Sequence, residues 1–203
     1  MKRIFVLLLA VVMLLGMTAC GGAKQQDYKL GMGVDVTTDS SKSGTAQADA
    51  TVATVVLDKD GKIVACKLDV ATGKLSVTEG ELEEDATDKV FKTKKELKDE
   101  YNMKAASGIG KEWYEQAEFF EGYVVGKTAE QVATLEKDAD LAAGCTMDVS
   151  GFKAAIAKAC ADDQAKMFKA SDMKLGLAAI TTADSSKDAD DENDGSANIY
   201  STF

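Results

Sequence analysis

The stretch TVATVVLDKDGKIVACKLD, residues 51–69, decides the fold that we expect for this chain. Its two arms, Thr51–Leu57 and Lys62–Asp69, are rich in β-branched residues and alternate loosely along the chain, which is typical of strands. Asp58-Lys59-Asp60-Gly61 lies between them and is a strong turn signal, because glycine adopts the positive φ that tight turns require. The stretch therefore predicts a β-hairpin.

Further strand signals flank this hairpin on both sides. An earlier strand is expected over Tyr28–Thr37. Gly73 predicts another turn, and Leu75–Thr78 predicts a short strand after it. The first half of the chain is therefore predicted to be mostly strand.

Apolar residues at helical spacing dominate the second half of the chain. We expect one helix over Thr87–Lys104, ended by Ser107-Gly108-Ile109-Gly110, and a second helix over Lys111–Val125. A third, short helix opens at the capping box Thr128-Ala129-Glu130-Gln131, and a fourth runs over Ser150–Met167 with Ser150 as its cap. Strands first and helices later favour an α+β fold, in which helices pack on an antiparallel sheet.

The first twenty residues have the pattern of a bacterial export signal. Lys2-Arg3 forms a short positive region, and an apolar run over Ile4–Leu15 follows. About a dozen residues are too few to span a bilayer as a helix, so residues 1–19 are predicted to be a signal peptide. Gly16-Met17-Thr18-Ala19-Cys20 resembles a bacterial lipobox, which implies a lipid anchor on Cys20 and a polar tether over residues 20–27. The alternative is an ordinary cleaved signal peptide with an incidental cysteine.

The composition excludes several classes of function. Without Lys2 and Arg3 the chain has 22 basic and 34 acidic residues, a net charge of −12, which nucleic acid and an anionic membrane surface would repel. We therefore expect no nucleic-acid partner. The chain has no histidine, which removes Ser–His and Cys–His nucleophilic mechanisms and the usual ligand of transition metals. We predict no catalytic residue and no metal site.

Three cysteines, Cys66, Cys145 and Cys160, remain after lipidation of Cys20. An odd number excludes a complete disulfide framework. One pair can form, and the sequence does not determine which.

A fourteen-residue segment occurs twice in the chain. Lys29–Lys42 and Lys174–Lys187 are identical at eight of fourteen positions, at a constant offset of 145 residues. We infer that residues 28–173 form one module and that residues 174–203 are the incomplete start of a second, repeated module. A simpler alternative is that the last strand completes the sheet of the first module.

The stretch Asp138–Ala159 carries the motif on which a functional prediction rests. Ala143-Gly144-Cys145-Thr146 precedes the predicted helix at Ser150 and resembles the Ser-Gly-Ala-Thr-like motif of the FMN-binding domain family. This family occurs in the C subunit of the sodium-pumping NADH:quinone oxidoreductase, in the G subunit of Rnf complexes and in extracellular flavoprotein lipoproteins. Three more segments resemble the family in the same order, over roughly residues 50–161 of the chain. They are the hairpin Val55–Leu68, Ser107-Gly108-Ile109-Gly110 and Phe120–Lys127.

The resemblance implies an FMN-binding-domain-like α+β fold and a covalent cofactor. In many members of the family the motif threonine carries FMN through a phosphoester bond, and the matching hydroxyl here belongs to Thr146. Gly144 and Cys145 complete the expected cofactor-binding segment, and Gly144 would let the backbone approach a phosphate closely. Free N–H groups of the helix that starts near Ser150 would also favour an anion. Aromatic residues of the second helix are open to two interpretations, a stacking wall for the flavin or ordinary core. They are Trp113, Tyr114, Phe119, Phe120 and Tyr123.

We therefore expect an extracytoplasmic lipoprotein, anchored to the cell membrane, that binds FMN and transfers electrons to or from a redox partner protein. The alternative is a non-enzymatic lipoprotein that kept the fold, lost the flavin and binds a ligand or partner. Ala143 stands where the family has Ser or Thr, and Cys145 stands where it has Ala, which favours the alternative. In that case Gly144-Cys145-Thr146 is only a turn leading into a helix. In either case we expect an electron carrier or a binding protein rather than a catalyst.

Overall fold

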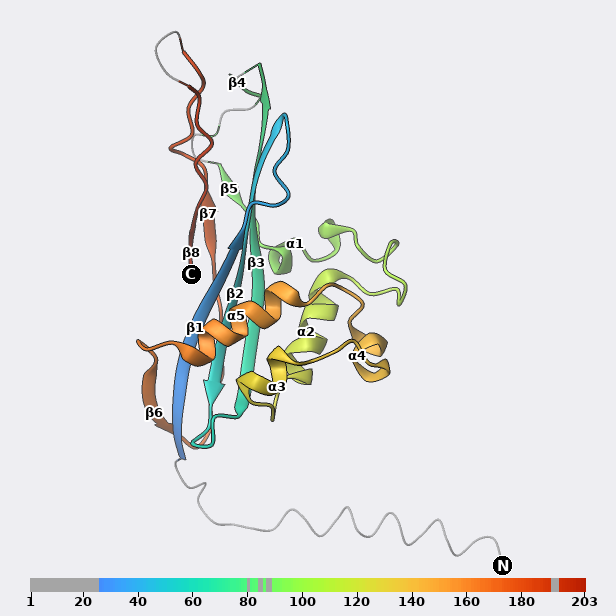
Figure 1. The fold of residues 1–203 in the computed structure, drawn as a ribbon, viewed down its shortest axis with the longest axis vertical. Helices are drawn as coiled ribbons and strands as arrows, with labels where there is room; N and C mark the ends of the chain where they lie inside the picture. Colours follow the sequence, from blue (N-terminus) through green and yellow to red (C-terminus); the bar gives the residue numbers. More distant parts are fainter. Residues whose placement is uncertain (1–25, 80, 84–85, 87–88, 191–193) are drawn as a thin grey trace, which may run out of the picture.

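The computed structural model describes residues 26–79, 81–83, 86, 89–190 and 194–203. The predicted signal peptide, Cys20 and most of the tether lie outside this part of the chain. The described residues form an α+β fold with two antiparallel sheets (Figure 1). One sheet has the strand order β4-β3-β2-β1-β6, and the other has the order β5-β7-β8. The predicted class, α+β with antiparallel strands, is therefore confirmed.

The five-stranded sheet is built from two very long strands and their neighbours. Its members are β1 (Gln26–Thr37), β2 (Thr45–Leu57), β3 (Ile63–Thr78), β4 (Glu81–Leu82) and β6 (Lys166–Ala170). The smaller sheet consists of β5 (Val90–Phe91), β7 (Ile180–Thr182) and β8 (Tyr200–Thr202).

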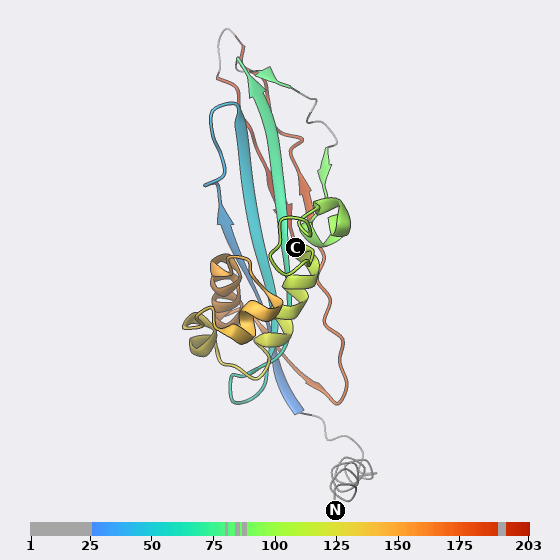
Figure 2. The same ribbon diagram turned by 90° about the vertical axis from the view of Figure 1, so that its right-hand side faces the viewer.

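The helices are short and lie between β5 and β6 in the sequence. They are α1 (Lys94–Leu97), the 3₁₀ helix η2 (Lys98–Tyr101), α2 (Trp113–Tyr123), α3 (Ala129–Ala133), α4 (Ala139–Gly144) and α5 (Ser150–Ala161). Figure 2 shows α5 and the C-terminal segment on opposite sides of the long sheet. The main core lies between β2, β3, α2 and α5, where Leu68, Phe120 and Ile156 are fully buried.

The hairpin predicted from residues 51–69 is present as β2 and β3. Gly61 has a φ of +73°, as the turn requires. The Asp58 carboxylate accepts the N–H groups of Asp60 and Lys62, each at 2.9 Å, and so fixes the turn. Both strands extend well beyond the predicted limits, and the predicted strand over Tyr28–Thr37 is confirmed as β1.

The predicted turn at Gly73 is wrong, because β3 runs through this residue without a break. A Cβ atom on Gly73 would lie 2.3 Å from Cγ2 of Ile199, which packs against the strand from the C-terminal segment. Gly73 is therefore needed for close packing of Ile199 and not for a change of chain direction.

The predicted helix over Thr87–Lys104 is largely wrong. Val90 and Phe91 form β5 and pair with Thr182 and Thr181 of β7. Among the described residues of this range, only α1 and η2 are helical, and α1 begins at a capping box between Thr93 and Glu96. Pairing with a segment about 90 residues away in the sequence thus overrides the helical spacing of the apolar residues.

The other predicted helices are present with adjusted limits. The second corresponds to α2, and the third corresponds to α3, whose Thr128–Gln131 capping box is formed. The fourth ends at Ala161 instead of Met167, because residues 166–170 form β6 beside β1. The sequence did not predict α4.

The two copies of the repeated segment have different environments. The first copy is mostly β1, in the middle of the long sheet, whereas the second contributes only β7. The last strand, β8, joins β5 and β7 and not the five-stranded sheet. The division into one module and the start of another stays a prediction.

Candidate functional site

Thr146, the predicted flavin acceptor, lies in the short loop between α4 and α5 and is half-buried. Its N–H and its hydroxyl both donate to Oε1 of Gln116, at 2.9 and 3.2 Å. Gln116 is fully buried in α2, and its Nε2 donates to the Ser107 hydroxyl and to the Lys111 carbonyl oxygen, each at 3.1 Å. One amide therefore joins two of the segments that the sequence singled out, Ser107–Gly110 and Gly144–Thr146.

Gly144 is in close contact with a side chain of α2. It is the last residue of α4, and a Cβ atom there would lie 2.2 Å from the ring of Phe119. The missing side chain therefore makes room for an aromatic ring of α2. The predicted approach of a phosphate to the Gly144 backbone stays a prediction.

Cys145 follows α4 and is completely buried. Burial raises the pKa of its thiol, because the charged thiolate is poorly solvated there. A buried thiol of raised pKa is a weak nucleophile and packs as a small apolar side chain. Among the three candidate residues of the motif, only Thr146 presents a reactive atom that is not fully buried.

The N-terminus of α5 is already next to an anion. The residue before the helix is Val149, and the Asp148 carboxylate accepts the Ser150 N–H at 2.9 Å and the Ser150 hydroxyl at 3.0 Å. These hydrogen bonds lower the pKa of Asp148, so its negative charge is stabilised there. The expectation that Ser150 itself caps the helix is wrong, and the expected attraction for a ligand phosphate is reduced by Asp148.

A lysine supplies positive charge next to Thr146. The Lys137 amine donates to the Thr146 carbonyl oxygen. A second amine, that of Lys153, donates to the Leu135 carbonyl oxygen at 2.9 Å, and both lysines lower the pKa of Asp148. No sequence signal distinguishes these two lysines, because lysines are common throughout the chain.

The predicted aromatic wall is divided between the core and the surface. Trp113 and Phe120 are buried in the main core. Phe119 and Tyr123 are half-buried and stack with 6.1 Å between ring centroids and 24° between planes. The Tyr123 hydroxyl donates to Asp138 at 3.1 Å. Only these two rings form an outer stack, and they lie along α2 on the side of α4.

A cleft of about 530 Å³ lies near the loop of Thr146, between the β1–β2 part of the sheet and the start of α5. This volume is in the range of small-molecule sites. Trp113, Phe152 and Met147 contribute apolar lining. Charged lining comes from four aspartates and one lysine, namely Asp35, Asp39, Asp49, Asp148 and Lys94. Sequence reasoning missed this cleft, because its residues come from six separate segments.

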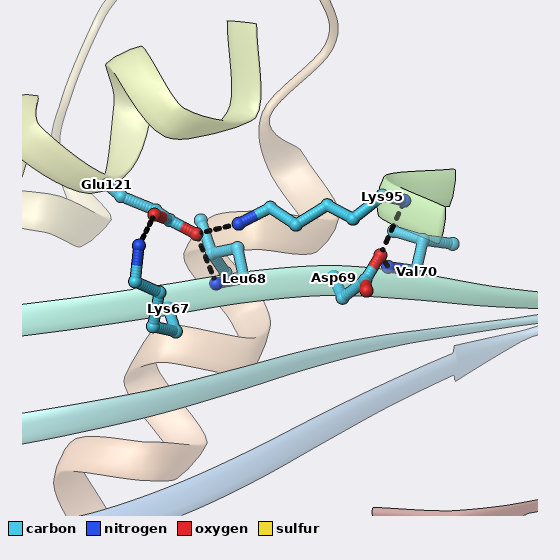
Figure 3. Close-up of polar contacts among 6 residues, drawn as sticks. All are labelled: Lys67, Leu68, Asp69, Val70, Lys95 and Glu121. Carbon is cyan, nitrogen blue, oxygen red and sulfur yellow. Dashed lines mark hydrogen bonds and ion pairs between the residues drawn. The ribbon is translucent and has the colours of Figure 1, made fainter. Parts of the chain in front are cut away.

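A buried carboxylate in α2 is a further feature that the sequence did not indicate. Glu121 is 4% exposed and accepts hydrogen bonds from the amines of Lys67 and Lys95 and from the Leu68 N–H (Figure 3). Beside it, Asp69 accepts the N–H groups of Val70 and Lys95. These contacts attach α1 and α2 to the outer edge of β3 and thereby fix the helix that carries Gln116.

The described residues contain neither a metal-binding cluster nor a membrane-spanning helix. Within this part of the chain, no three or more Asp, Glu or Cys side chains gather in a way that could hold a metal ion. No helix in the same part is both long and apolar enough to cross a bilayer.

Comparison with known proteins gives one partial similarity. No protein-family model and no solved structure matches the chain. The chlorophenol reductase of Desulfitobacterium hafniense is 38% identical in an alignment of 93 residues, and the match covers 40% of this chain. The match spans 28% of the reductase, well under a third of its length.

Proposed function

We propose that this chain is an extracytoplasmic lipoprotein that carries FMN on Thr146 and transfers electrons. The observation that carries the proposal is the position of the Thr146 hydroxyl, which Gln116 holds beside the segment Ser107–Gly110. These two segments belong to the resemblance with the FMN-binding domain family, and nothing in their sequence requires them to meet. The lipobox-like segment that ends at Cys20 supports the anchor and the location outside the cytoplasm.

The residues around Thr146 fit a phosphoester in three respects. The hydroxyl belongs to a half-buried residue, so one side of it is accessible. Esterification removes the hydroxyl proton that Gln116 Oε1 accepts, but this oxygen still accepts the Thr146 N–H. The buried amide oxygen therefore keeps a hydrogen-bond partner. The Lys137 amine lies at the carbonyl oxygen of the same residue and can compensate the single negative charge of a phosphodiester.

Bound FMN would supply the redox chemistry, and the protein would supply binding and orientation. Gln116 would hold the acceptor residue, and Lys137 would balance the phosphate charge. The partially similar protein of Desulfitobacterium hafniense is called a chlorophenol reductase, and a redox role for this chain agrees with that name.

A second candidate function is a binding lipoprotein that has the fold without the flavin. The cleft near Thr146 favours it, because four aspartates and one lysine in the lining are unfavourable for an anionic ligand. The contact between Phe119 and Gly144 and the position of Asp148 favour it as well. Such a protein would take an uncharged or cationic ligand in the cleft.

Intact-mass spectrometry decides between the two functions. The mature protein would be produced in a host with the flavin-attaching enzyme, together with Thr146→Ala and Thr146→Ser. The flavoprotein gains the mass of one FMN less one water, loses this gain in Thr146→Ala and retains it at least in part in Thr146→Ser. An unmodified mass in a colourless native protein would leave the binding lipoprotein as the function.

A further inference from the structure

The end of the molecule from which the tether leaves is formed by β6, the start of β1 and the β2–β3 turn, which carries Asp58 and Asp60 beside Lys59 and Lys62 (Figure 1). β1 and β6 pair antiparallel, from Gln26 opposite Ala170 to Leu30 opposite Lys166 (Figure 1). Cys20 precedes Gln26 by six residues, and six residues span at most about 20 Å when fully extended. A lipid on Cys20 therefore keeps this end within about 20 Å of the bilayer surface.

The side chains of β6 have the composition of a segment that lies in a membrane interface. Met167 is 68% exposed, the largest exposure of any large hydrophobic residue in the described part of the chain. In the sequence Lys166 precedes Met167 and Lys169 follows it, and both lysines are exposed. Phe168 is half-buried, with its ring centroid 5.7 Å from that of Tyr28. Apolar side chains of this kind enter the headgroup boundary, while the lysine amines reach the lipid phosphates.

The charge of the molecule is unevenly distributed along its long axis. β6 carries two lysines and no acidic residue, although Asp27 pairs with Lys169 at 3.8 Å. The opposite end, formed by the β1–β2 loop and the β3–β4 turn, is acidic (Figure 1). Its described charged residues are Asp39, Glu79, Glu81, Glu83 and Lys42. An anionic leaflet therefore repels this far end more strongly than β6.

Protection of a free sheet edge is a second explanation for lysines on β6. The outer edge of β6 has no strand partner among the described residues, and lysines on an edge strand discourage pairing with other chains. This explanation accounts for Lys166 and Lys169. It does not account for the exposure of Met167 between them, which would favour self-association of the edge.

We propose that β6 and residues 26–29 form a membrane-contacting face that lies on the lipid headgroups beside the anchor. The proposal rests on the lipid anchor of the proposed function and is independent of flavin. Contact through this face directs the acidic end away from the bilayer. The net charge of the chain predicts repulsion from an anionic surface, whereas this face is locally positive, with Lys29, Lys166 and Lys169 against Asp27.

Tryptophan fluorescence on vesicles tests the membrane-contacting face. The lipidated full-length protein would carry Met167→Trp or, as a control near the other end of β1, Val36→Trp, which replaces a residue that is 61% exposed. The native Trp113 is 5% exposed and stays in both variants as a constant background. Vesicles would contain phosphatidylglycerol and phosphatidylcholine, with or without bromine on the acyl chains. In Met167→Trp we expect a blue shift and loss of about half of the added emission on brominated vesicles. In Val36→Trp we expect neither change.

Charge reversal provides a matched second measurement in the Met167→Trp background. Lys166→Glu with Lys169→Glu should abolish the quenching. Lys42→Glu with Lys74→Glu, the same charge change at exposed positions away from β6, should preserve it.

Each contrary result overturns a distinct part of the proposal. Sedimentation with vesicles without quenching in either variant would retain the anchor and exclude the face. Equal quenching of both variants would show a molecule lying flat. A concentration-dependent blue shift without vesicles would assign the face to a second copy of the chain. A soluble protein without diacylglycerol by mass would exclude the anchor and this proposal together.

Discussion

The Glu121 carboxylate accepts the backbone N–H of Leu68 at 2.8 Å, across 53 positions of sequence. β3 pairs with β2 along its length but with β4 only at Val77–Thr78, so the N–H of Leu68 lies on a strand edge without a strand partner. Glu121 replaces the missing partner, and the amines of Lys67 and Lys95 balance its charge (Figure 3). A single carboxylate thereby attaches α2 to the sheet.

Glu121→Gln should lower the free energy of unfolding by about 2 kcal/mol, because it weakens charge-assisted hydrogen bonds and leaves a partly buried Lys95 without its counter-ion. Glu118→Gln, on the exposed side of the same helix, is the control and should change stability by less than about 0.5 kcal/mol. Urea denaturation measures both. Equal effects of the two substitutions would mean that the buried network contributes nothing specific.

Asp69 should make stability depend on pH in a defined direction. Burial is the largest effect on this carboxyl and raises its pKa above the usual 3.8. The folded state therefore binds the proton more tightly than the unfolded state. The resulting stabilisation is fully present below pH 3.8, the ordinary pKa of the carboxyl. It is lost as the pH rises through the higher pKa of the folded state. Relative to Asp69→Asn, the wild type should gain stability as the pH falls from neutral towards about 4. Urea denaturation at both pH values checks this, and a difference independent of pH would contradict it.

Local signals predicted the parts of the fold that local interactions determine. The turn at Asp58–Gly61 and the capping box at Thr128 are fixed by residues within four positions of each other. Gly73 and Val90–Phe91 were misassigned, because their conformation depends on Ile199 and β7 in the C-terminal segment. A single sequence contains no periodic signal for such distant pairing.

The same distinction applies to the candidate site. The motif located Thr146, but its orientation depends on Gln116, which is thirty positions away and lies in a helix of ordinary composition. Gly144 of the motif packs against the ring of Phe119, which is a reason for glycine that the motif does not indicate. Phe119 requires the space above Gly144, and helical spacing alone does not show which ring of α2 reaches α4.

Equivalent glycines of the two repeat copies should respond differently to substitution. In Gly31→Ala the new Cβ would lie 2.1 Å from the Ala159 carbonyl oxygen of α5, a backbone atom that cannot move without shifting the helix. We expect a loss of about 3 kcal/mol. Gly176→Ala, 145 positions later, meets no atom within 4 Å and should be neutral or slightly stabilising. Thermal or urea unfolding compares the two, and similar losses would mean that both copies pack alike.

The three described cysteines should differ in reactivity according to their burial. Burial raises the pKa of the thiols of Cys66, Cys145 and Cys160, so each reacts slowly near neutral pH. Only Cys160 is half-buried, and the other two are buried. Iodoacetamide should therefore label Cys160 first in the native protein and all three in urea, as peptide mass spectrometry would show. Rapid native labelling of Cys145 would contradict the packing described beside Thr146.

Gln116 should control whether Thr146 can be modified. Gln116→Leu removes the acceptor for the Thr146 N–H and hydroxyl and the donor to Ser107, so we expect a loss of about 2 to 3 kcal/mol and little or no flavin attachment. Gln116→Glu keeps two acceptor oxygens for Thr146 and loses the donor, so attachment should persist at a reduced level. Intact mass gives the modified fraction, and urea denaturation separates this effect from unfolding. If Gln116→Leu remains folded and is modified as fully as the wild type, the buried amide does not position the acceptor.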